Sequence, residues 1–156
     1  SEEKCRLARE HGAAHVINYN DEDIVARVRE LTGGEGVPVV YDSVGKDTFT
    51  ASLDCLRRRG LMVSFGNASG AVEPFAPAGL SKRGSLVLSR PTLFDYMHTQ
   101  EEQEAMTAEL FDMVGSGKVT VEVRQAFALA EAGEAHRALE ARRTTGTTVL
   151  VPELTS

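Results

Sequence analysis

Few residues in this chain have the type and spacing that side-chain catalysis or metal binding requires. The four histidines lack the spacing of metal ligands. Cys5 and Cys55 each lie in a helical pattern with no CxxC motif or histidine beside them. We therefore interpret both as reduced, mostly buried side chains rather than as a disulfide or a metal site. Cys55 also lies near a predicted helix C-terminus, which disfavours a thiolate. We expect no catalytic residue and no metal ligand.

Residues suited to binding a ligand follow three predicted strands. Tyr19 follows the strand His15–Asn18, and its hydroxyl can donate a hydrogen bond to a phosphate oxygen. The other two groups are Ser43, Val44 and Gly45 after "VPVVYD", and Phe65, Gly66 and Asn67 after "LMVS". The alternatives are a Tyr19 ring packed on the sheet and a Phe65 side chain in the core. Asp42 is assigned no role beyond that of a turn former.

Helices and strands alternate along the predicted chain. The predicted helices are 1–12, 21–31, a segment with Phe49, Leu53 and Leu56 on one face that ends in "RRRG", 101–114, and "AGEAHRALEARR". The predicted strands or extended segments are His15–Asn18, "VPVVYDSVG", "LMVSFG", "SLVLSRP", "KVTVEVRQAFAL" and "TTVLVP", and residues 67–84 form a loop with one short turn. This order predicts an α/β fold with a doubly wound, mostly parallel sheet. In that class the ligand lies outside the carboxyl ends of the strands, where the residues above are found.

The opening element of a dinucleotide-binding fold is missing from the sequence. Such a fold begins with a strand, a G-x-G-x-x-G turn and a helix that holds the pyrophosphate. "GGEG" and "GNASG" do not run from a strand straight into a long helix. In the strand order 3-2-1-4-5-6, His15–Asn18 would be the third strand and would lack its central neighbours. We expect a truncated sheet without the first two strands and the glycine-rich turn.

Composition restricts the class of protein. The net charge of −6 argues against a general surface for nucleic acids or anionic membranes. No apolar run approaches the roughly 20 residues that span a bilayer, and "SEEKCRLARE" lacks the apolar core of a signal peptide. We expect a cytoplasmic protein without nucleic-acid or membrane partners.

Four segments together are more specific than any glycine pattern. They are "GAAHVINY", "VVYDSVG", "RRGLMVSFGNASG" and "TTGTTVLVP". With them the chain resembles the zinc-independent NADPH:quinone oxidoreductases, the zeta-crystallin-like branch of the medium-chain dehydrogenase/reductase superfamily, from Ser1 to about Pro152. The resemblance implies a two-domain enzyme that passes hydride from NADPH to a quinone or a similar electron-poor carbonyl compound without a metal. Residues 1–120 would be part of its dinucleotide-binding domain, and 121–156 would return toward the catalytic domain.

The resemblance also implies roles for individual residues. Lys4, in the first turn of its helix, matches the family's lysine for the 2′-phosphate of NADPH, where an acid would instead select the ribose hydroxyl. Tyr19 would contact the adenosine phosphate, Ser43 and Val44 would flank the adenine-ribose, and Phe65, Gly66 and Asn67 would lie beside the nicotinamide. Arg142, four residues before Gly146, matches a phosphate-binding arginine. The alternatives are a solvated Lys4 near glutamates and an Arg142 that complements its helix terminus.

The strand near Ser85–Arg90 is the expected edge of the sheet. In this superfamily the equivalent strand pairs across a two-fold axis, and an exposed apolar edge independently suggests such pairing. We expect a homodimer of the enzyme through this strand. The alternative to a cofactor-binding segment is a catalytically inactive fragment that acts only as a folded dimerisation module.

Overall fold

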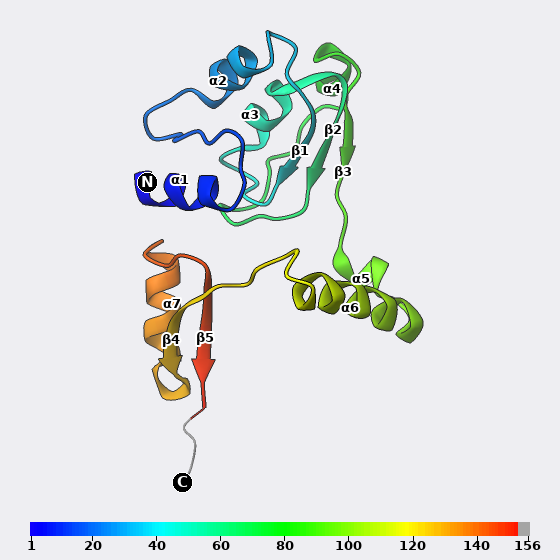
Figure 1. The fold of residues 1–156 in the computed structure, drawn as a ribbon. Helices are drawn as coiled ribbons and strands as arrows, with labels where there is room; N and C mark the ends of the chain where they lie inside the picture. Colours follow the sequence, from blue (N-terminus) through cyan, green and yellow to red (C-terminus); the bar gives the residue numbers. More distant parts are fainter. Residues whose placement is uncertain (153–156) are drawn as a thin grey trace. The chain divides into compact units, whose positions relative to one another are not determined.

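The computed structural model describes residues 1–152, which divide into two compact units (Figure 1). The first unit ends at Tyr96 and the second begins at Met97. These units reflect contacts within this chain. The predicted division of the enzyme's domains at residue 120 concerns a larger molecule and stays a prediction.

The first unit is built on a three-stranded parallel sheet of order β1-β2-β3. Its strands are β1 (Val37–Asp42), β2 (Leu56–Ser64) and β3 (Val87–Ser89), so the "SLVLSRP" strand lies at an edge as predicted. Its helices are α1 (Glu2–Glu10), α2 (Ile24–Leu31), α3 (Phe49–Asp54), α4 (Ala78–Lys82) and α5 (Leu93–Tyr96). Figure 1 shows α2 and α3 close together beside β1 and β2.

The hydrophobic core of this unit lies between α3 and the sheet. It consists of side chains that are each less than a tenth exposed, namely Phe49, Leu53, Leu56, Met62 and Leu86. The helical spacing of Phe49 and Leu53 directs both toward the sheet. Cys5 and Cys55 are free and buried, and burial raises the pKa of the Cys55 thiol, as expected for an unreactive cysteine.

The second unit contains α6 (Gln100–Gly115), β4 (Val123–Ala128), the short 3-10 turn η1 (Leu129–Glu131), α7 (Ala132–Glu140) and β5 (Thr147–Val151). Strands β4 and β5 pair in parallel. The Thr99 hydroxyl accepts from the Glu102 N–H while the Glu102 carboxylate accepts from the Thr99 N–H, which fixes the start of α6. Every strand pair within residues 1–152 is parallel, which agrees with the predicted α/β class.

The predicted strand His15–Asn18 is wrong, because residues 13–18 are irregular. A strand is defined by its ladder, and the apolar pattern alone does not supply a partner. No strand within residues 1–152 pairs with this segment or with the outer edge of β1. That edge strand exposes Val39 by 37% and Tyr41 by 73%.

The predicted helix end at "RRRG" is also wrong. Helix α3 ends at Asp54, and Leu56 and the three arginines already belong to β2. The register with β1 is broken here: β2 advances from Leu56 to Leu61 while β1 advances only from Val37 to Val39. Residues 57–60 therefore form a bulge, a device that changes the direction of side chains.

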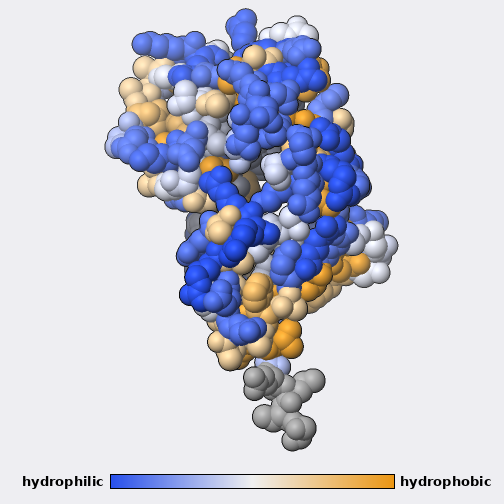
Figure 2. Space-filling view, turned by 90° about the vertical axis from the view of Figure 1, so that its left-hand side faces the viewer, coloured by the Kyte–Doolittle hydropathy of each residue, from blue (hydrophilic) through white to orange (hydrophobic). Residues whose placement is uncertain are grey.

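Large apolar side chains also reach the surface, including Phe94, Phe111, Leu129 and Leu139. On the face drawn in Figure 2, hydrophobic residues (orange) lie among hydrophilic residues (blue). No helix within residues 1–152 is both long and apolar enough to cross a membrane.

The carboxylate of Asp42, which is only 4% exposed, connects the end of β1 to α3. One oxygen accepts from the N–H groups of Val44 (2.8 Å) and Gly45 (3.0 Å). The other accepts from the hydroxyls of Thr48 (2.8 Å) and Ser52 (2.7 Å). Burial by itself raises the pKa of Asp42, but these four hydrogen bonds together hold the pKa below its ordinary value. Asp42 is therefore an ionised anchor for the chain reversal after β1.

We predict that Asp42→Asn lowers the free energy of unfolding by about 1–3 kcal/mol at pH 7. A neutral amide would replace the carboxylate that accepts hydrogen bonds from four donors, so the charge-assisted part of these bonds is lost. The lowered pKa means that the stabilisation is present above the ordinary aspartate pKa and is lost as the pH falls through the folded-state pKa. The difference in free energy of unfolding between wild type and variant should therefore become smaller as the pH is lowered from 7 to about 2, as measured by urea titrations. The matched control is Asp47→Asn, an exposed carboxylate in the same loop. A gap that stays constant with pH would contradict the role of the charge.

Candidate nucleotide-binding site

Two loops at the carboxyl ends of β1 and β2 form the centre of the candidate site. They are residues 43–46 and 65–70, joined by a series of backbone hydrogen bonds. Ala68 N–H donates to Ser43 O (3.2 Å), Ser69 N–H to Val44 O (2.8 Å), and Lys46 N–H to Gly70 O (3.2 Å). The Ser69 hydroxyl also donates to Val44 O (2.8 Å). The two predicted groups of site residues are thus held together as one surface.

Glycines allow the two loops to touch backbone to backbone. A Cβ atom at Gly66 would lie 2.3 Å from the Ser43 carbonyl oxygen, and one at Gly45 would lie 2.8 Å from the Gly70 carbonyl oxygen. Gly45 also has φ +87°, in the left-handed region that favours glycine. The predicted close approach therefore occurs within the chain itself, whatever else binds there.

The side chains around this loop pair are accessible. Ser43 and Asn67 are exposed, Val44 is half-buried, and Phe65 is 50% exposed. Phe65 is therefore not a buried core residue in this chain, which was the alternative interpretation of its position. The loop pair presents hydroxyl, amide and aromatic groups around a short glycine backbone, a combination suited to a nucleoside.

Lys4 and Tyr19 lie on two segments that Asn18 connects. The Asn18 side-chain amide donates to Glu2 of α1 (3.2 Å) and to Asp21 in the turn after Tyr19 (2.6 Å). Lys4 is exposed on α1, and Tyr19 is 64% exposed in this turn. The structure thus fixes the start of α1 against the Tyr19 turn, although 15–18 is not a strand.

Arg142 belongs to the second unit, just after α7. Its N–H donates to Leu139 O (2.9 Å), and it has φ 55°, an uncommon value for a residue with a side chain. Its side chain is exposed. Its proposed phosphate role stays a prediction.

Sequence reasoning missed two residues that build this site, namely Asn18 and Ser69. It identified Asp42 only as a turn former, and the structure adds its hydrogen bonds from the Thr48 and Ser52 hydroxyls. Asn18 and Ser69 act between segments distant in sequence, and no local pattern indicates such pairs. Both are polar residues in irregular segments, and their long-range contacts are visible only in the folded chain.

Within residues 1–152, no group of three or more His, Cys, Asp or Glu side chains is placed to hold a metal ion.

Comparison with known proteins identifies the family. Residues 11–150 match a family model described as zinc-binding dehydrogenase. The described residues supply no ligand set for the zinc in that description, so we derive no chemistry through it.

Similar proteins include oxidoreductases with related functions. The chain is 56% identical over 152 residues to a quinone oxidoreductase of Pseudomonas aeruginosa, covering 97% of this chain and 47% of that protein. It is 46% identical over 154 residues to a 2-haloacrylate reductase of a Burkholderia species, covering 98% and 46%. A solved structure of Escherichia coli quinone oxidoreductase complexed with NADPH superposes with a TM-score of 0.93 at 49% identity, covering 97% of this chain and 47% of that one.

The chain thus spans about half the length of the relatives that it matches. Its similarity to quinone oxidoreductases confirms the resemblance predicted from the sequence. The chain belongs to the family described as zinc-binding dehydrogenases.

Proposed function

We propose that this chain is the cofactor-binding part of an oxidoreductase that transfers hydride from NADPH to a quinone or a similar electron-poor carbonyl compound. The observation that carries the proposal is the paired loop surface at the carboxyl ends of β1 and β2, in a chain that resembles an NADPH-bound quinone oxidoreductase. The similarity to a 2-haloacrylate reductase supports a substrate range wider than quinones.

Each proposed contact uses a chemical group suited to it. The ammonium of Lys4 would neutralise the 2′-phosphate, and the Tyr19 hydroxyl would donate to a phosphate oxygen. Ser43 and Val44 would flank the adenine-ribose, while the Arg142 guanidinium would contact phosphate. Phe65, Gly66 and Asn67 would lie beside the nicotinamide. The 50% exposure of Phe65 leaves its ring available for that contact.

The proposed reaction requires the protein to position the dinucleotide rather than to supply an acid or a base. A bound reduced nicotinamide supplies the hydride. The residues of this chain would hold the dinucleotide in a fixed orientation, so that less conformational freedom is lost when the substrate arrives. The Asp42 hydrogen bonds support this role, because they hold the 43–46 loop in one conformation. We assign no catalytic residue.

We further propose a cytoplasmic enzyme that forms a homodimer through its edge strand. Strand β3 lies at the end of the sheet order, and Val87 is 54% exposed. An apolar edge strand offers unpaired backbone groups to an identical strand of a second copy.

We predict that NADPH binds to the 156-residue chain with a dissociation constant in the millimolar range or below, measured by the quenching or enhancement of nicotinamide fluorescence. A Ser43→Trp variant should weaken this binding, because the indole would fill the surface between the two loops. The control is Thr107→Trp, an exposed position on α6. If NADPH fails to bind at millimolar concentrations, standalone binding is excluded and the dimerisation module becomes the better description of this chain.

We predict that Lys4→Ala, in a full-length enzyme that contains this chain, weakens NADPH binding about tenfold or more and changes NADH binding little. Only NADPH carries the 2′-phosphate that Lys4 would contact. The matched control is Lys118→Ala, an exposed lysine in the second unit. Equal losses for the two cofactors would remove Lys4 from the 2′-phosphate role.

A further inference from the structure

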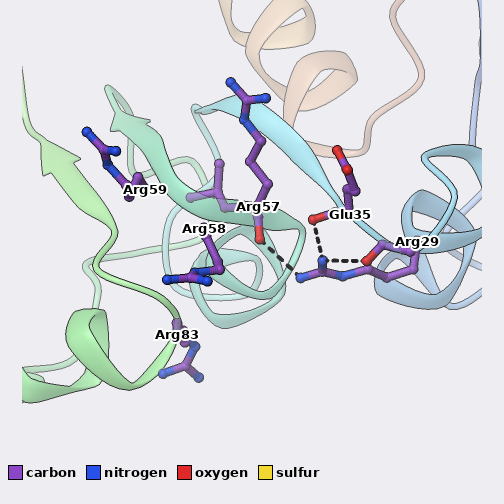
Figure 3. Close-up of a pocket in the computed structure, with 8 residues that line it drawn as sticks. Arg29, Glu35, Arg57, Arg58, Arg59 and Arg83 are labelled. Carbon is purple, nitrogen blue, oxygen red and sulfur yellow. Dashed lines mark hydrogen bonds between the residues drawn. The ribbon is translucent and has the colours of Figure 1, made fainter.

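A cavity of about 740 Å³ lies at the opposite end of β2 from the proposed cofactor loops (Figure 3). Its charged lining is unusual in a chain with a net charge of −6. Five arginines and a single glutamate line it: Arg29, Arg57, Arg58, Arg59, Arg83 and Glu35.

Arg29 lines this cavity, but its guanidinium group is already hydrogen-bonded to the backbone. One guanidinium nitrogen donates to Gly34 O (3.0 Å) and Glu35 O (2.6 Å). The other donates to Asp54 O (2.7 Å) and Leu56 O (3.0 Å). Figure 3 shows the Arg29 guanidinium group with its hydrogen bonds to backbone carbonyl groups of the other lining residues. Arg29 thus fixes the turn that leads into β2 and so positions the arginines that follow.

The bulge at 57–60 turns consecutive arginines outward. Arg59 has φ 59°, which is costly for a residue with a side chain, and its N–H donates to Gly84 O (2.8 Å). Gly84 packs against the stem of Arg58, where a Cβ would lie 3.0 Å from the Arg58 Cγ. Figure 3 shows the arginine side chains projecting away from β2. The backbone therefore holds an energetically costly conformation that presents positive charge.

The arginines of the bulge have unused hydrogen-bonding capacity. Within residues 1–152, the side chains of Arg57, Arg58 and Arg59 are exposed and make no hydrogen bond or ion pair. Arg83 is already paired with Asp54 (2.6 Å). These three positive charges come from consecutive residues that line one cavity, and a ligand with several negative charges would neutralise them.

We propose that this arginine pocket is a binding site for a small anion with two or more phosphoryl groups. A guanidinium offers a planar fork of donors that matches a pair of phosphate oxygens. One phosphate group would leave part of the three free positive charges uncompensated, whereas a pyrophosphate group matches them better. The pocket lies at the amino end of β2, while the proposed cofactor loops follow its carboxyl end, so this site is separate from the proposed NADPH site.

The test is a calorimetric titration of the 156-residue chain with inorganic pyrophosphate at constant ionic strength. We expect Arg57→Gln/Arg58→Gln to raise the dissociation constant about tenfold or more, because two sets of charge-assisted hydrogen bonds are removed. The matched control is Arg6→Gln/Arg9→Gln, which removes the same charge from exposed positions on α1. Circular dichroism checks that both variants are folded.

Amide chemical shifts of the wild-type chain give an independent measurement that needs no variant. Pyrophosphate should shift the amides of residues 56–60 and 83–84, and inorganic phosphate should bind there more weakly. Equal losses in the two double variants would indicate a general charge effect and overturn the proposal. Shifts confined to the surroundings of Lys4 and Tyr19 would place the anion in the cofactor site and also overturn it. Failure of NADPH binding leaves either result unchanged.

Discussion

The parallel pairing of β1 with β2 is the constraint on which the first unit depends. It places the carboxyl ends of both strands at one edge and brings residues 43 and 66 into backbone contact. The same pairing buries Leu56 and Met62 against α3, so the core and the loop surface are consequences of one register. Since a one-residue slip would turn every side chain to the other face, this register is fixed by burial as much as by hydrogen bonds.

Each end of this strand pair has one charged side chain that satisfies backbone groups. At the carboxyl end, the Asp42 carboxylate accepts from two N–H groups of the turn that follows β1. At the amino end, the Arg29 guanidinium donates to four carbonyl oxygens. Polar backbone groups in tight turns destabilise a fold when they are buried unpaired, and these two residues remove that cost where helices and strands meet. The turn after β1 and the segments that lead into β1 and β2 are thereby held in one conformation.

The sequence predicted the features that depend on local pattern. It failed where a neighbouring segment determines the structure. The apolar runs of β1 and β2, the helical face of Phe49 and Leu53, and the meeting of the 43–46 and 65–70 loops at one edge of the sheet all follow from periodicity and topology. His15–Asn18 has a strand-like composition, but a strand also needs a neighbour, and none lies within residues 1–152. The arginines of "RRRG" suit a helix terminus equally well, and only the register of β2 places them in a bulge. Asn18 could not be recognised because Glu2, which it contacts, lies 16 residues away.

The outer edge of β1 connects these observations. Val39 and Tyr41 lie on β1, which pairs with β2 along one of its edges only. Residues 13–18 follow α1 without pairing with a strand. An extended segment paired with that edge would satisfy its backbone groups and cover the exposed side chains. The segment that carries Tyr19 is held instead by Asn18 and its carboxylate partners. These polar contacts hold the Tyr19 turn although no strand pairs with it, whereas the 43–46 and 65–70 loops are positioned by the strands that they follow.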